Sequence, residues 1–156
     1  MGIGTVTIGE QLLEIEKYVP LLDEFSPAVS AAPVAWHIDH SLRVIIKTVS
    51  AMEESDQMKY QKKFSFRKSL VFLSGKIPRG KARSPSVVLP PDNLNIEDLE
   101  LQISLARHHV EKMDSLPQKA YFDHPYFSHL KKKEAIRFVV IHTEHHLKIV
   151  RDILKT

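Results

Sequence analysis

Residues 131–154 read KKKEAIRFVVIHTEHHLKIVRDIL, and this stretch decides the expected fold. Six positions in it follow one another at spacings of four and three, which predicts one long helix with a single inward face. Because an unbroken seam of this kind packs against other helices, the stretch predicts the last helix of a helical bundle. The inward positions are Ala135, Val139, His142, His146, Ile149 and Ile153.

Four further stretches carry apolar residues at helical spacing. They cover about 8–25, from just after Pro33 to about Met58, about 60–73, and about 94–115. No run alternates strictly enough to predict a strand, and His124-Pro125-Tyr126-Phe127 is expected to lie in a loop. Residues 76–93 hold four prolines without a helical period, which predicts a long crossover loop. The expected fold class is therefore all-α.

The composition narrows the kinds of site that this chain can build. Its 156 residues predict a single domain over 1–156, with 43% hydrophobic residues to form a core. Nine histidines stand against no cysteine, which excludes disulfides, thiolate metal sites and cysteine nucleophiles. No apolar run approaches the roughly 18 residues of a membrane span, and the first residues lack the pattern of a signal peptide. We therefore expect a cytoplasmic protein without membrane partners.

Two histidines occupy seam positions where leucine or valine would be usual. The i, i+4 spacing of His142 and His146 points both imidazoles to the same side of the helix. Burial of two unpartnered imidazoles costs a few kcal/mol, and one divalent ion would satisfy both. Zinc proteases share this spacing but need a glutamate where this chain has Thr143, so their mechanism is not predicted.

The second helix offers two candidates for a further ligand. His37 lies about 100° from the centre of its apolar face and His40 about 160°, so His37 is the better interior ligand. His40 is expected at the surface, although a rotated helix would let it bind instead. Asp39 is expected to cap, pair or orient a neighbour. His40, His109 or Glu144 could assist as a proton carrier, and nothing in the sequence ranks one above the others. We assign no chemistry to His124 or His129.

Two motifs resemble the DinB-like superfamily, which includes bacillithiol-transferase-type proteins. They are Asp123-His124-Pro125-Tyr126-Phe127-Ser128-His129-Leu130 and Ile141-His142-Thr143-Glu144-His145-His146-Leu147, and the loop over 75–82 is similar to an uncharacterised branch. The resemblance implies an antiparallel four-helix bundle with a long crossover between helices two and three, a homodimer, and zinc or nickel. It also implies His142 and His146 as metal ligands, with the third ligand early in helix two, where Trp36-His37-Ile38-Asp39 fits.

These observations favour a divalent-metal-binding protein. The leading hypothesis is a metal-dependent hydrolase or thiol/group transferase in which His37, His142 and His146 leave one position open for water or a small substrate, anionic or thiol-containing. The alternative is a helical bundle that a metal ion stabilises and that catalyses no reaction.

Residues 57–91 support a different alternative, because they hold nine Lys/Arg and no acid. A binding module for nucleic acid or another anionic ligand could use the basic segment 59–83, in which Phe64, Phe66 and Phe72 are interleaved. We expect instead that these aromatic rings pack inward and that the lysines are solvated. The basic loop could also steer an acidic substrate into the metal pocket.

Overall fold

The computed structural model describes residues 2–80, 86–91 and 94–156. Within these residues the chain forms five α-helices, three short 3₁₀ helices and one two-stranded sheet. None of the described helices is long and apolar enough to span a membrane. The elements are α1 (Ile3–Tyr18), η1 (Val19–Leu21), α2 (Val34–Glu53), η2 (Gln57–Lys59), α3 (Phe66–Ser74), η3 (Ser86–Val88), α4 (Ile96–Met113), β1 (Tyr121–His124), β2 (Ser128–Lys131) and α5 (Lys132–Ile153).

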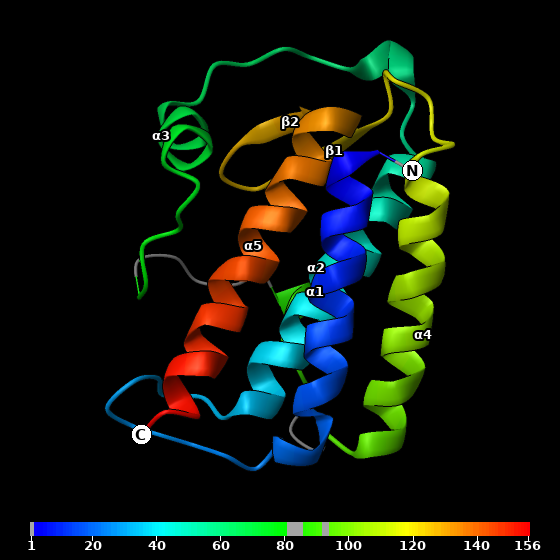
Figure 1. The fold of residues 1–156 in the computed structure, drawn as a ribbon. Coiled ribbons are helices and arrows are strands. Elements are labelled where there is room, and N and C mark those ends of the chain that lie inside the picture. The colour runs from blue at the N-terminus through cyan, green and yellow to red at the C-terminus, as the bar shows by residue number, and fades with distance from the viewer. Residues whose placement is uncertain (1, 81–85, 92–93) are drawn as a thin grey trace.

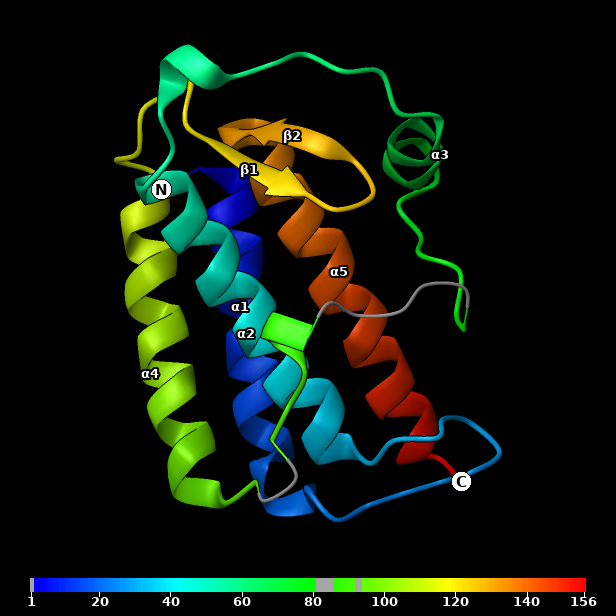
Figure 2. The ribbon, with the colours of Figure 1, turned by 180° about the vertical axis from the view of Figure 1, so that it is seen from behind.

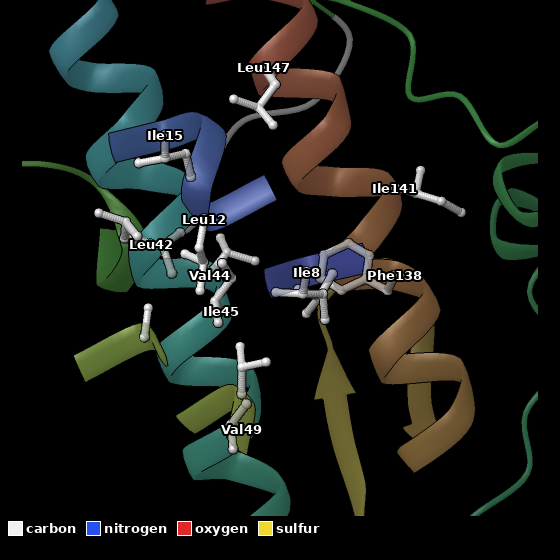
Figure 3. Close-up of a cluster of buried hydrophobic side chains, with 14 of the residues drawn as sticks. Ile8, Leu12, Ile15, Leu42, Val44, Ile45, Val49, Phe138, Ile141 and Leu147 are labelled. Atoms are coloured by element: carbon white, nitrogen blue, oxygen red, sulfur yellow. The ribbon is translucent and has the colours of Figure 1, made fainter. Parts of the chain in front are cut away.

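The chain is mostly helical, as the sequence predicted, and its four long helices share one core. Helix α2 packs against α4 and α5, and α1 packs against the same two helices (Figure 1). Figure 3 shows Ile8 and Leu12 of α1 in the same buried cluster as Leu42 and Ile45 of α2. Five apolar residues at helical spacing in α4 are all buried, and their burial orients that helix. They are Leu99, Ile103, Ala106, Val110 and Met113.

Several helix ends differ from the predicted bounds. Helix α1 ends at Tyr18 instead of near 25, because Pro20 has no N–H to continue the helical hydrogen bonds and the chain tightens into η1. Helix α3 begins at Phe66, where the Ser65 hydroxyl accepts from the backbone N–H of Lys68 at 3.2 Å. Gly75 ends α3 with φ +64°, in the left-handed region that glycine tolerates best.

The predicted loop around His124 is a β-hairpin, so the expectation of no strand was wrong. Strands β1 and β2 are antiparallel, with His124 paired to Ser128. Each strand has four residues, too few for an alternating pattern to be visible in the sequence. The Nδ1 atom of His124 accepts from the backbone N–H groups of Tyr126 and Phe127 at 3.1 and 3.2 Å. These two bonds fix the turn, and the hairpin packs on α2 and α5 (Figure 2).

The segment between α3 and α4 packs back onto the long helices. Its short helix η3 contacts α2 and buries Val88 there. Arg79 forms an ion pair with Asp152 of α5, with 2.6 Å between Nη2 and Oδ2. Helix α2 is therefore covered on the side that faces away from α1 and α4, whereas Lys81 and Arg83 of the basic segment fall outside the described residues.

Candidate metal centre

Three histidines from two helices meet where α2 faces α5. One ring nitrogen from each of His40, His142 and His146 lies within 4.8 Å of the other two. The ring centroid of His40 is 5.1 Å from that of His142 and 4.8 Å from that of His146. The two histidines of α5 are 4.7 Å apart, which agrees with their predicted i, i+4 pairing. We call these three residues the histidine cluster.

His40 is buried, with only 2% of its surface exposed, so the expectation of a surface histidine was wrong. The ring is covered by η3, and its Nδ1 lies 2.8 Å from the carbonyl oxygen of Val88. A neutral imidazole that donates Nδ1–H to this carbonyl carries its lone pair on Nε2. Trp36 stacks on the His40 ring, with 4.8 Å between the ring centroids and 21° between the ring planes. These contacts fix the ring in the tautomer that a metal ligand requires.

His37, the predicted helix-two ligand, lies beside the cluster and is not one of its three members. Its Nδ1 is 3.0 Å from Nδ1 of His146, and its Nε2 is 2.9 Å from the Ser30 hydroxyl. If His37 donates to Ser30, its Nδ1 accepts from His146, and the lone pair of His146 is then on Nε2. In this arrangement His37 positions a ligand, as residues behind a metal site commonly do. Direct ligation by His37 stays a prediction.

One ring of the cluster has a buried nitrogen without a hydrogen-bond partner, as expected when a bound ion is the missing partner of a site. Nδ1 of His142 is buried and has no hydrogen-bond partner, which is uncommon for an imidazole nitrogen in a protein interior. Zinc–nitrogen bonds are about 2.1 Å long, so two nitrogens in a tetrahedral site lie about 3.4 Å apart. The nitrogens of the cluster, which lie within 4.8 Å of one another, would therefore have to move inward to bind one ion. Three imidazole nitrogens suit several divalent transition-metal ions.

The cluster is also neutral at physiological pH, which is the protonation state that binds metal. Burial holds the pKa values of His142 and His146 well below the ordinary range. Burial likewise lowers the pKa of His40. It lowers the pKa of His37 to about 4, with neighbouring His40, His145 and Arg79 acting in the same direction.

The cluster forms part of the wall of a cavity of about 730 Å³. Aromatic side chains from the hairpin and α5 line much of the rest: Phe122, Phe127 and Phe138. His124 and His145, to which we assigned no role from the sequence, also line the cavity. No spacing in the sequence indicated either one, because the hairpin places His124, and the segment around Ile77 covers His145.

The remaining candidates lie elsewhere. Asp39 is fully buried and accepts hydrogen bonds from Arg43 and Gln102, both at 2.5 Å, so its expected pairing role is confirmed. His109 has its Nδ1 3.8 Å from a carboxylate oxygen of Glu53 on α2. Neither residue lines the cavity.

Glu144 points toward a surface ion network and away from the cavity. It accepts from Arg151 at 2.9 Å, and Arg151 also binds Glu14 of α1. The sequence-based candidates for proton transfer thus include one member of the cluster, His40, and two residues that the structure does not bring to it.

No family model, no curated protein and no solved structure matches this chain. The kind of protein is therefore indicated by its fold and its histidine cluster alone. The protein is a mostly helical chain with a buried three-histidine cluster that could bind a metal ion. Membership of the DinB-like superfamily stays a prediction.

Proposed function

We propose that this protein binds one divalent ion, zinc or nickel, through His40, His142 and His146, on an antiparallel four-helix bundle of the DinB-like kind. The observation that carries the proposal is the convergence of three buried imidazoles within 4.8 Å on a cavity wall. The unpartnered Nδ1 of His142 and the oriented rings of His40 and His146 support it.

We further propose a metal-dependent hydrolase or group transferase. Three protein nitrogens leave an open coordination position, which is the arrangement of catalytic sites. A bound ion would supply Lewis acidity to a water or thiol at this end of the cavity. Val88 and His37 hold two of the ligand rings, while Phe122, Phe127 and Phe138 exclude water.

Proton transfer falls to His145 in this proposal. It lines the cavity, its ring centroid is 5.0 Å from that of His146, and it is not one of the three ligands. His124 lines the cavity too, but its Nδ1 is committed to the hairpin turn.

Metal content tests the proposal directly. After purification without a histidine tag and incubation with zinc or nickel, elemental analysis should find about one ion per wild-type chain. The His142→Ala/His146→Ala variant should hold none, because a single remaining imidazole binds too weakly. His108→Ala, on the exposed side of α4, is the matched control and should retain the ion. Wild-type protein that stays metal-free after this incubation would refute the proposal.

A second candidate function is favoured by an unexpected exposure. Phe64 is 85% and Phe66 72% exposed, so the expectation that these rings pack inward was wrong for both. Exposed aromatic rings among lysines form a stacking surface for single-stranded nucleic acid. Binding of an oligothymidylate should then fall steeply with added salt, and Phe64→Ser/Phe66→Ser should weaken it by about tenfold or more. An absence of binding at low salt would end this candidate.

A further inference from the structure

One face of α2 extends the cavity wall away from the histidine cluster. His40, Val44, Lys47 and Thr48 all line the cavity, and their spacing places them along one side of the helix. Lys47 lies seven positions after His40, which corresponds to a rise of about 10.5 Å along the helix axis. The wall therefore runs from the imidazole rings, past an aliphatic side chain, to an ammonium group.

Thr48, at the far end of this wall, has a buried hydroxyl group that makes no hydrogen bond. The residue is 1% exposed, and its Oγ1 has no hydrogen-bond partner. An unsatisfied buried hydroxyl destabilises a fold, whereas valine would fill the same space without that cost. Thr48 lines the cavity, but its Oγ1 is itself covered, so rotation of χ1 is needed to turn the hydroxyl toward a polar group of a bound molecule.

Lys47, the residue before Thr48, is exposed and also lines the cavity. Among residues 2–80, 86–91 and 94–156 it makes no ion pair, whereas the other cation of the lining, Arg79, is paired with Asp152. Asp123 is the acidic residue of the lining, and its carboxylate lies 3.8 Å from His129. The lining also includes apolar side chains, among them Val44, Phe122 and Phe138.

We propose that the cavity binds an elongated small molecule with an apolar body and a terminal carboxylate, which contacts Lys47 and Thr48 while the other end of the molecule lies at the histidine cluster. The reaction of the bound molecule at the histidine cluster rests on the proposed function above. The rise of about 10.5 Å between the backbone positions of His40 and Lys47 equals the length of an extended chain of about eight to ten carbons, which sets the size of the test molecule. The cavity volume of about 730 Å³ is within the range that encloses such ligands.

The carboxylate end is tested on metal-free protein, so that no ion competes for it. After chelator treatment at pH 8, titration calorimetry compares octanoate with 1-octanol. Wild-type protein should bind octanoate about two- to fivefold more tightly than octanol, the range of a partly exposed ion pair. Lys47→Met keeps the apolar stem and should remove this preference. Lys17→Met, an exposed lysine of α1 outside the cavity lining, should keep it.

Thr48→Val provides a second, independent readout. It should raise the melting temperature of the ligand-free protein, because an unsatisfied hydroxyl is removed. The same substitution should weaken octanoate binding without affecting that of octanol. Equal affinities for octanoate and octanol in wild type, or an unchanged preference in Lys47→Met, would overturn the proposal.

Zinc and a dicarboxylate together distinguish a failure of the carboxylate subsite from a failure of the metal site. Once zinc is added, octanedioate should bind more tightly than octanoate, since one carboxylate can reach the cluster while the other stays at Lys47. If zinc does not bind but octanoate is still preferred over octanol through Lys47, the metal proposal fails and the carboxylate subsite stands. If zinc binds but octanoate is not preferred in the metal-free protein, the subsite fails alone.

Discussion

Substitution of His40 by alanine should abolish tight zinc binding, whereas His37→Ala should weaken it only about 10- to 100-fold, the usual effect of losing a residue behind a ligand. The difference follows from geometry, because His40 belongs to the group within 4.8 Å and His37 contacts that group through Nδ1 of His146. Competition with a chromogenic chelator at pH 7.5 measures both affinities on the same scale.

A conservative variant makes this comparison sharper. In His37→Asn, the side-chain oxygen can replace Nδ1 as the acceptor for His146, so most of the affinity lost in His37→Ala should return. The opposite ranking, with His37→Ala abolishing binding and His40→Ala retaining it, would establish the ligand set predicted from the sequence: His37, His142 and His146.

Acid should destabilise the metal-free protein strongly between about pH 6.5 and pH 4. Burial lowers the pKa of His124 from 6.5 to about 4, so the unfolded chain takes up a proton in this window that the folded chain does not. Stability is thus fully present above pH 6.5 and is lost as pH falls toward 4. His124 alone should account for about 2–3 kcal/mol of the loss. Urea unfolding at pH 7 and pH 4.5, with chelator present, measures it.

His124→Asn isolates this contribution. The asparagine oxygen can accept from the amides of Tyr126 and Phe127 as Nδ1 does, but it does not titrate. The variant should keep most of its stability at pH 7 and show a clearly weaker dependence on pH. The exposed variant His108→Asn should follow the wild type. An acid dependence in His124→Asn equal to that of wild type would contradict the assignment.

The sequence predicted best the residues that lie on the core-facing stripe of a helix. The seam of α4 and the i, i+4 histidines of α5 follow directly from helical periodicity. Helix α2 did not, because it is buried on two sides: Leu42 and Ile45 face the core, and His40 faces η3. A wheel centred on one apolar stripe necessarily places His40 in solvent.

The rest of the site depends on segments without periodicity. The hairpin that carries His124 has strands of four residues, and its turn is held by an imidazole acceptor that propensity scales do not describe. The covering segment around η3 has no pattern that indicates where it packs. Their positions follow from tertiary contacts alone, so the cavity could not be predicted.

The hydrogen bond between Val88 and His40 has a consequence for how this protein can diverge. Surface connections usually tolerate insertion and deletion, and 77–88 reads in the sequence like such a connection. Here its backbone carbonyl fixes the orientation of an imidazole 48 positions earlier in the chain. Lengthening this connection would therefore disturb the histidine cluster although every histidine remained, so indels here should be constrained much as they are inside a helix.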